Sequence, residues 1–375
     1  MTEIITSLRE IPQTDWDELA GGDPFISHGY LSALEESKCV GERTGWYPCH
    51  LIKKKSGKLV AAMPTYLKHH SYGEYVFDWS WADAYQRHGL KYYPKLISAV
   101  PFSPVSGNRL LARDASMRND LINGALAFSI KNSLSSFHCL FHSELDRHTL
   151  KSANLMSRQT IQFHWKNHDY DSFSQFLSRM ASRKRKKIRQ ERNKLVKEKF
   201  SFNHITGADI TSSDWEFFYH CYLLTYRNHN STPYLSLDFF LKIAEKIPNN
   251  MVLIIAKKNG HRVASALNVL GQDKLYGRYW GTTSYFPGLH FEVCYYQALE
   301  YCIEHGITSF EGGAQGEHKL SRGLEPVKTF SSHWIADERF RRAISNHLNH
   351  EDIGIESYVD ELEKHTPFKN NPLEA

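Results

Sequence analysis

Hydrophobic positions in the second half of the chain first recur with the short period of strands. Three apolar runs of strand length follow one another closely: Val252–Lys257, Val263–Leu270 and Lys274–Gly281. Asn259-Gly260 separates the first two runs, and this dipeptide is typical of the two-residue type I′ hairpin turn. The pattern therefore predicts an antiparallel meander of three strands.

The period then changes to that of a helix. Four apolar side chains recur at helical spacing within 291–302, which favours an amphipathic helix packed on the meander. A short strand, Ile307–Phe310, follows, and Glu311 stands where this strand ends. Ligands of open α/β sheets gather at the carboxyl ends of strands. Because glycines, Gln315 and charged side chains fill the next segment, we predict that Glu311–Arg322 is the active-site loop.

The remaining pattern predicts helices and strands in both halves of the chain. A hairpin turn is expected at Ser56-Gly57. The other expected elements are helices over Ala82–His88, Met117–Ser133, Phe173 to about Lys199, Trp215–Arg227 and Leu237–Ile247, and strands over Pro104–Leu111, Phe137–His142, Thr160–Trp165, Ser201–Ile205 and Thr329–Ala336.

The two halves share an outline of an opening strand, helices, antiparallel hairpins, a helix and a closing strand. This outline predicts an α+β fold of two lobes, the first over residues 1–158 and the second over 159–366, with a loose tail at 367–375. A length of 375 residues also favours two domains, and 41% hydrophobic residues suffice for two full-sized cores.

Composition adds a prediction about the cellular compartment. The six cysteines form no C-x-x-C pair, which favours free thiols in a reducing compartment. The N-terminus lacks the apolar region of a signal peptide. The longest apolar run, Met251–Ala256, is far too short to span a bilayer. We therefore expect a soluble, cytoplasmic protein without a membrane span.

The net charge of +5 has a local origin. Ten of the 46 basic residues and two of the 41 acidic residues lie within 182–199, so the rest of the chain carries more acidic than basic residues. A solvated charged face is one interpretation of this helix. Because clustered like charges repel one another unless an anion is near, we favour contact with a polyphosphate or a nucleic-acid backbone. The expected contacts are Arg183, Lys184, Arg185 and Lys187.

The third strand of the meander carries a cation between aromatic residues. Arg278 and Trp280 share one face by strand alternation, and Tyr279 occupies the other. Arg is almost never buried without a partner, so Arg278 requires an anion, which Glu311 or a ligand could supply. Trp280 and Tyr279 suit either a substrate contact or an aromatic core.

A second aromatic segment, in the first half, combines rings with carboxylates. Asp78, Trp81, Asp83 and Tyr85 could hold a sugar or a cationic amine by stacking and charge. The same residues could equally form a capped turn at the start of a helix.

Several kinds of chemistry lose support because their motifs are absent from the sequence. The 21 histidines include no H-E-x-x-H motif, and His69-His70 has no third placed ligand, so no metal site is expected. No G-x-S-x-G elbow and no P-loop occur, which disfavours serine-hydrolase and NTPase chemistry.

These segments together resemble the FemAB-like predicted N-acyltransferases of the GNAT superfamily, and the resemblance covers nearly the whole chain. It is specific for the family but not for a substrate. The segments that carry it are Ser71–Trp79, Gln162–Trp165, the basic residues of 182–192, Tyr276–Gly281, Phe291–Ala298 and Glu311–Lys319.

The resemblance implies two GNAT-like lobes, each a mixed, mainly antiparallel sheet flanked by helices. It also implies transfer of an acyl or aminoacyl group to an amine. Fem transferases use aminoacyl-tRNA and a cell-wall precursor, whereas ordinary GNAT enzymes bind acyl-CoA with an R/Q-x-x-G-x-G/A loop. This chain has Gly281–His290 at that place instead, which leaves the basic helix for a larger phosphorylated donor.

The expected co-substrate is therefore acyl-CoA or aminoacyl-tRNA, with no permanently bound cofactor and a tRNA contact through the basic helix as one option. The acceptor is an amine, for which a peptidoglycan precursor is one candidate. No particular oligomeric state is predicted.

Direct transfer requires a deprotonated amine, a stabilised oxyanion and two reactants held together. The predicted bases are Glu311 or Glu317, with His318 as the alternative. The other predicted roles are donor phosphate or oxyanion binding by Lys319 and Arg322, orientation of an anionic group by Arg278, and reception of the amine by Asp78 and Asp83.

Two rival functions remain open at this point. One is a non-catalytic GNAT-like module that binds RNA or cell-wall fragments. The other is an acyl-CoA-dependent N-acyltransferase that acts on a small amine.

Overall fold

A computed structural model describes residues 2–313 and 316–369. The chain divides into two compact units. The first combines Met1–Thr160 with Lys328–Ser357, and the second combines Ile161–Val327 with Tyr358–Ala375. Residues 328–357 therefore return to the first unit, whereas the sequence predicts one continuous second lobe over 159–366.

The first unit contains strands in two groups. In the smaller group all neighbours are antiparallel, in the order β1 (Glu3–Ile5), β3 (His50–Lys55), β4 (Lys58–Met63) and β7 (Leu111–Ala112). In the other group only β6 and β8 are parallel. Its order is β15 (Glu325–Ile335), β8 (Ser136–His142), β6 (Lys95–Ser98), β5 (Tyr66–Lys68) and β2 (Trp46–Pro48).

Helices of the first unit pack around these strands. The main ones are α1 (Gln13–Ala20), α2 (His28–Glu36), α3 (Trp79–Arg87), α4 (Ala115–Lys131) and α5 (Glu144–Ser152). The long helix α12 (Glu338–Lys364) begins in this unit and ends in the second.

The predicted strand Pro104–Leu111 is wrong except at its last residue. Gly107 forms an isolated β-bridge with His142 of β8, and its N–H donates to the Phe141 carbonyl, but near Arg109 the backbone is satisfied by side chains. The Asp146 carboxylate accepts hydrogen bonds from the N–H groups of Arg109 and Leu110, and the buried Arg109 guanidinium donates to the carbonyls of Val105 and Leu140. Such bonds replace a β-ladder.

The second unit is built on one mixed sheet. Its strand order is β10 (Phe200–Thr206), β11 (Met251–Lys258), β12 (His261–Leu270), β13 (Lys274–Thr282), β14 (Ser309–Glu311) and β9 (Met156–Lys166). Only β13 and β14 run parallel. The predicted meander is confirmed, and Asn259 and Gly260 have φ angles of 50° and 82°, as a type I′ turn requires.

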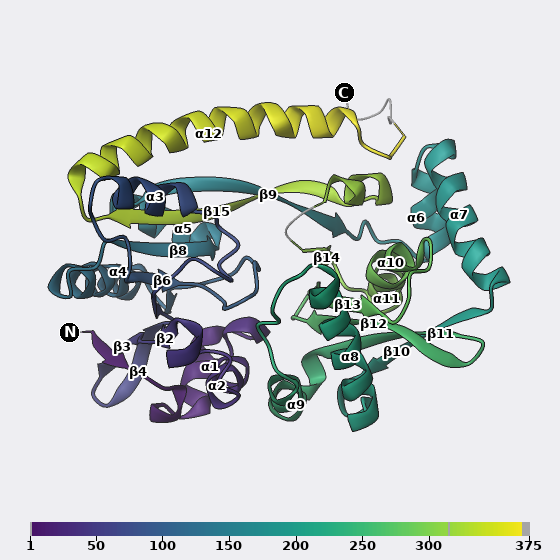
Figure 1. The fold of residues 1–375 in the computed structure, drawn as a ribbon, viewed down its shortest axis with the longest axis horizontal. Helices are drawn as coiled ribbons and strands as arrows, with labels where there is room; N and C mark the ends of the chain where they lie inside the picture. Colours follow the sequence, from purple (N-terminus) through teal and green to yellow (C-terminus); the bar gives the residue numbers. More distant parts are fainter. Residues whose placement is uncertain (1, 314–315, 370–375) are drawn as a thin grey trace. The chain divides into compact units, whose positions relative to one another are not determined.

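Helices cover both faces of this sheet (Figure 1). One face carries α8 (Ser212–Asn228) and α9 (Leu237–Lys246). The other carries α10 (Leu289–Phe291), the π-helical turn η6 (Glu292–Tyr296) and α11 (Gln297–Glu304). At Gly281 a Cβ atom would lie 1.9 Å from the Cys221 carbonyl oxygen, so α8 packs closely enough to require glycine. The predicted α+β class, with mainly antiparallel sheets flanked by helices, is confirmed.

The single long helix predicted from Phe173 to about Lys199 is two helices, α6 (Phe173–Arg179) and α7 (Ser182–Lys197). Between them Met180 is extended and forms a β-bridge with Phe368, and the Ala181 N–H donates to the Pro367 carbonyl at 2.9 Å. The first residues of the predicted loose tail are therefore bound to the second unit, and residues 370–375 lie outside the described part of the chain.

Candidate active site

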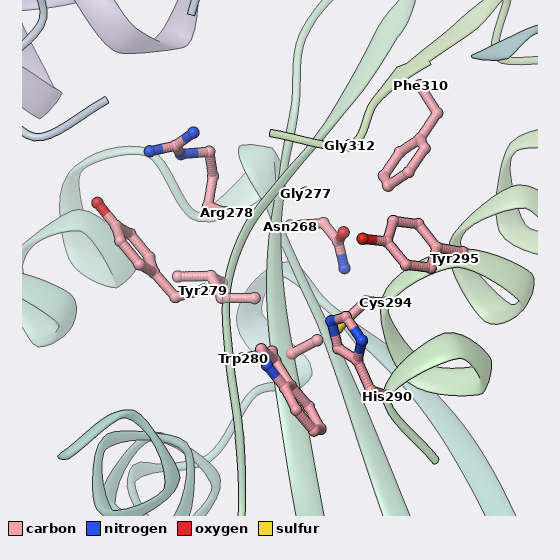
Figure 2. A pocket seen from close by; sticks show the side chains of 12 residues that line it. Asn268, Gly277, Arg278, Tyr279, Trp280, His290, Cys294, Tyr295, Phe310 and Gly312 are labelled. Carbon is pink, nitrogen blue, oxygen red and sulfur yellow. The ribbon is translucent and has the colours of Figure 1, made fainter. Parts of the chain in front are cut away.

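The parallel pair β13 and β14 creates an opening in the sheet of the second unit. Their pairing ends at Tyr276 and Glu311, where β14 stops, but β13 continues to Thr282. Along its other edge β13 carries a bulge against β12, at which the pairing shifts between Leu267 and Asn268. A cavity of about 100 Å³ lies at this place. Its polar and aromatic lining comprises Asn268, Arg278, Tyr279, Trp280, His290, Cys294, Tyr295 and Phe310 (Figure 2).

Asn268 supplies an unused donor to this cavity. The residue is 1% exposed, and its side-chain nitrogen has no hydrogen-bond partner among the described residues. Figure 2 shows the Asn268 amide and the Tyr295 hydroxyl pointing toward one another. An unsatisfied buried donor costs stability, so a ligand carbonyl in the cavity would complete its bonding.

Tyr295 and His318 form a hydrogen-bonded pair at the cavity. Their hydroxyl oxygen and Nε2 atom are 3.1 Å apart. Burial raises the pKa of Tyr295, so the hydroxyl stays protonated at neutral pH. Burial also lowers the pKa of the more exposed His318, and the charges of Arg322 and Lys319 act in the same direction. A neutral imidazole can exchange protons with both the phenol and solvent.

Lys319 is buried behind the glycines of the same loop. Its ammonium donates to the Gly313 carbonyl at 2.7 Å, and burial lowers the pKa of Lys319 to about 8. A Cβ atom at Gly312 would lie 2.8 Å from a Leu324 methyl group and 3.5 Å from Lys319 Cδ. The loop therefore needs glycine where Lys319 packs beside the cavity lining.

His290 forms part of the cavity wall. Its ring lies 4.6 Å from the Trp280 ring, measured between centroids. Burial lowers the pKa of His290 to about 4, helped by the charges of Arg322 and Lys319, so the imidazole is neutral at pH 7. His290 is therefore suited to hydrogen bonding and packing rather than to carrying a positive charge.

The predicted carboxylate bases do not line the cavity. Phe310 and Gly312 do, and strand alternation directs Glu311 to the opposite face. There the buried Glu311 carboxylate lies 3.3 Å from Lys274 Nζ and 3.9 Å from His164 Nδ1. Glu317 is exposed and accepts a hydrogen bond from the Tyr358 hydroxyl. Gln315 lies outside the described residues.

The bulge also changes the faces of the sheet on which the side chains of the third meander strand, β13, were predicted to lie. Arg278 falls between the pairs of Gly277 with Asn268 and Tyr279 with Leu267, so simple alternation fails there. Figure 2 shows Arg278 and Tyr279 extending away from Tyr295. The Tyr279 ring packs against Tyr222 and Phe240 of α8 and α9.

Arg322 connects the loop to α7 and to the central helix. It is 5% exposed, donates to the His318 carbonyl at 2.9 Å and lies 3.8 Å from Glu191. Its guanidinium also covers the Phe291 ring at 3.4 Å. These contacts hold the loop in place and leave little of Arg322 to face a donor phosphate.

The basic residues of α7 lie on or near the surface. Arg183 and Lys187 are exposed, and Lys184 and Arg185 are half-buried. Within the described residues none of the four makes an ion pair with an acidic side chain, and Arg185 donates to the Ser178 carbonyl. The helix therefore presents cations that an anionic ligand could neutralise.

The acidic and aromatic residues predicted to bind substrate belong to the first unit and are mostly core. Asp78, Trp81 and Tyr85 are each less than 5% exposed, and only Asp83 faces solvent. Asp78 accepts bonds from Lys95 and from the Tyr92 hydroxyl. Asp78 occupies the position before α3, but its side chain makes no capping hydrogen bond to this helix.

Three residues that the sequence predicts to contact substrate, Arg278, Tyr279 and Trp280, line the cavity, whereas Asn268, His290 and Tyr295 were missed. Asn268 lies within an otherwise apolar strand. A polar amide in such a strand could have indicated a functional residue. Tyr295 and His290 resemble ordinary helix residues, and only the packing of the central helix against the bulged strand makes them neighbours. The loop prediction, in contrast, did include His318 and Lys319.

No cluster of three or more His, Cys, Asp or Glu residues has an arrangement that could hold a metal ion in the described ranges. Within the same ranges no helix has both the length and the apolarity needed to cross a bilayer.

The fold and the cavity place the chain in a class of two-unit α+β proteins with a cavity at a strand opening. The chain belongs to the FemAB-like family, described as peptidoglycan biosynthesis/recognition, whose profile matches residues 7–370. No curated protein matches the chain in a sequence comparison.

Solved structures of distant sequence share the fold. FemX matches with a TM-score of 0.55 at 11% identity, over 89% of this chain and 98% of its own. The C-terminal domain of a protein named as a lysylphosphatidylglycerol synthetase from Agrobacterium fabrum matches with a TM-score of 0.56 at 9% identity, over 91% and 97%. The L-PGS structure from Bacillus licheniformis has a TM-score of 0.50 at 11% identity, over 87% and 97%.

Proposed function

We propose that the protein transfers an acyl or aminoacyl group directly to an amine at the cavity of the second unit. The observation that carries this proposal is the unused Asn268 amide opposite the Tyr295 hydroxyl. These are two donors of the kind that acyl transfer requires, one for an oxyanion and one for a leaving group. Membership of the FemAB-like family supports the same chemistry.

In the proposed reaction a neutral amine attacks the donor carbonyl, and the bond from that carbon to the leaving oxygen or sulfur breaks. Asn268 donates to the oxyanion that forms in between. The leaving group takes the proton of the Tyr295 hydroxyl, and the proton lost by the attacking amine returns to Tyr295 through water and His318. No covalent enzyme intermediate is needed, and the high pKa of Tyr295 keeps the hydroxyl protonated beforehand.

For the donor we propose aminoacyl-tRNA rather than acyl-CoA. The loop before the central helix, Gly281–His290, lacks the pyrophosphate-binding pattern expected of CoA-dependent GNAT enzymes. The exposed cations of α7 suit the repeated phosphates of a nucleic-acid backbone, which they would bind without reading its bases.

For the acceptor we propose an amine of a peptidoglycan precursor, on the strength of the family description. Of the two carboxylates predicted to receive it, Asp78 is buried and Asp83 is exposed.

A transfer assay tests this proposal. Bulk tRNA charged with radiolabelled amino acids, or acetyl-CoA in a parallel reaction, is mixed with a muramyl pentapeptide that carries a free amine. We expect label to enter the pentapeptide from tRNA. Tyr295→Phe is expected to lower kcat about 100-fold or more, since it removes the acid and little volume. Transfer from acetyl-CoA alone would overturn the donor assignment, and transfer from neither would overturn the proposed activity.

A further inference from the structure

The basic helix α7 also contacts the candidate active site with its buried side. The Glu191 carboxylate accepts a hydrogen bond from the Tyr296 hydroxyl at 2.8 Å and lies 3.8 Å from the Arg322 guanidinium. The next residue, Arg192, pairs with Glu292 and Glu300 at 2.9 and 2.7 Å. These contacts join α7 to the central helix and to the loop after β14.

Both partners of Glu191 are linked to the Tyr295–His318 pair. Tyr296 follows Tyr295 in the π-helical turn Glu292–Tyr296. Arg322 donates to the His318 carbonyl at 2.9 Å. A single carboxylate on α7 thus holds a neighbour of each member of the pair.

The contacts of α7 are made at the two ends of the π-helical turn that contains Tyr295. π-helical turns are rare, occur mostly as single turns inside α-helices and are frequent at functional sites. Here Arg192 binds Glu292 at the start of the turn, and Glu191 binds Tyr296 at its end. The orientation of Tyr295 inside the turn therefore depends on where α7 lies.

We propose that Glu191 is a positioning residue that couples polyanion binding on α7 to the geometry of the Tyr295–His318 pair. The inference rests on the proposed function, because that function defines the pair. Phosphates along the exposed face would relieve the repulsion among the cations of α7 and steady the helix. Through its contacts with Tyr296 and Arg322, Glu191 would then fix the positions of these two residues. A donor bound to α7 would in this way also orient the Tyr295–His318 pair.

The helix contains a matched control. Glu198 is the C-cap of α7, and among the described residues its carboxylate pairs with Lys194 and Lys258, at 3.9 and 4.0 Å, neither of which lines the cavity. Replacing either glutamate with alanine removes one negative charge from the same helix. Both variants should therefore gain affinity for bulk tRNA to a similar degree, which separates the charge effect from positioning.

The first test is a comparison of kcat and KM for Glu191→Ala and Glu198→Ala in the transfer assay. We expect Glu191→Ala to lower kcat about 10- to 100-fold with KM no higher than in Glu198→Ala, because small misplacements of reacting groups are costly. Tyr296→Phe, which removes only a hydroxyl, should reproduce the loss of kcat. Equal kcat values in both glutamate variants would overturn the inference.

A second test does not depend on turnover. Hydrogen exchange is measured for wild type and Glu191→Ala with and without bulk uncharged tRNA. In wild type, tRNA should slow exchange in α7, in residues 289–304 and in residues 316–323, whereas in Glu191→Ala only α7 should respond. Protection confined to α7 in wild type would overturn the coupling and leave the proposed transfer intact. The absence of any protection in α7 would overturn both the coupling and the nucleic-acid donor.

Discussion

At the scale of single residues, the site depends on a buried amide that the fold itself does not use. Asn268 sits in the apolar strand β12, and its side-chain nitrogen has no partner among the described residues. Leaving such a donor unsatisfied costs about 1–3 kcal/mol. Such a cost is understandable where a bound ligand supplies the missing hydrogen-bond acceptor. The cavity beside Asn268 provides space for such a ligand.

Replacing Asn268 with alanine should therefore separate activity from stability. We expect Asn268→Ala to lower kcat about 100- to 1,000-fold, the usual effect of losing an oxyanion donor, with no loss of the free energy of unfolding beyond about 1 kcal/mol. Ser265→Ala is the control, because Ser265 is buried on the same strand with an unpartnered hydroxyl but does not line the cavity. Similar rates in both variants would exclude the proposed role of Asn268.

Lys319 should give the protein a characteristic dependence of stability on pH. Its pKa of about 8 in the folded protein lies below the ordinary value of 10.5, so between these pH values the unfolded chain binds more protons than the folded one. The free energy of unfolding should rise with pH across this window because of Lys319. Lys319→Met should be at least as stable as wild type at pH 7 and should lose this rise. Urea unfolding at pH 7, 8.5 and 10 measures the free energy of unfolding of both proteins. An identical change of this free energy with pH in the two proteins would contradict the lowered pKa of Lys319.

At the scale of elements, tertiary contacts decide where the basic helix begins. Periodicity runs without interruption from Phe173 through Lys197, but Met180 and Ala181 bond to Phe368 and Pro367 near the end of the chain. These bonds separate α6 from α7. Because a contact between residues so far apart in sequence leaves no local signal, the sequence predicts one helix instead of two.

The exposed cations of α7 should bind nucleic acid mainly through charge. Arg183→Ala and Lys187→Ala are each expected to weaken binding of bulk tRNA and to lower the slope of log affinity against log salt by about 1. Fluorescence anisotropy at several salt concentrations measures both quantities. Lys54→Ala, an exposed lysine of β3 in the first unit, is the control and should leave the slope unchanged. If neither Arg183→Ala nor Lys187→Ala changed the slope of log affinity against log salt, these residues would not contact the nucleic acid.

At the scale of the whole molecule, each unit contains its own polar centre within an apolar core. In the first unit Lys95 is fully buried and donates to Glu74, Asp78 and Ser71. This cluster joins the segment before α3 to strand β6, which is a structural role. It accounts for Asp78, which the sequence alone would equally assign to a substrate.

Removing the cation of that cluster should be strongly destabilising. We expect Lys95→Met to lower the free energy of unfolding by about 3–5 kcal/mol, because it leaves two carboxylates buried without their partner. Lys91→Met is the control, since Lys91 is exposed in the same region. Thermal or urea unfolding compares the two variants. A loss below about 1 kcal/mol in Lys95→Met would show that water reaches the cluster.

The sequence by itself determined the three-strand meander of the second unit, the family resemblance and the loop that carries His318 and Lys319. These predictions rest on properties of neighbouring residues: the hydrophobic period, the Asn259-Gly260 turn and the local charge. The folded structure contains the predicted strands and the predicted turn. Only the tertiary structure decided that Glu311 faces away from the cavity, that Asp78 is bound by Lys95, and that Asn268 and Tyr295 meet. A bulge, an early strand end and a π-helical turn shape the surroundings of Glu311, Asn268 and Tyr295, and the burial of Lys95 in β6 sets the bonding of Asp78. Each of these features depends on packing between segments distant in the chain.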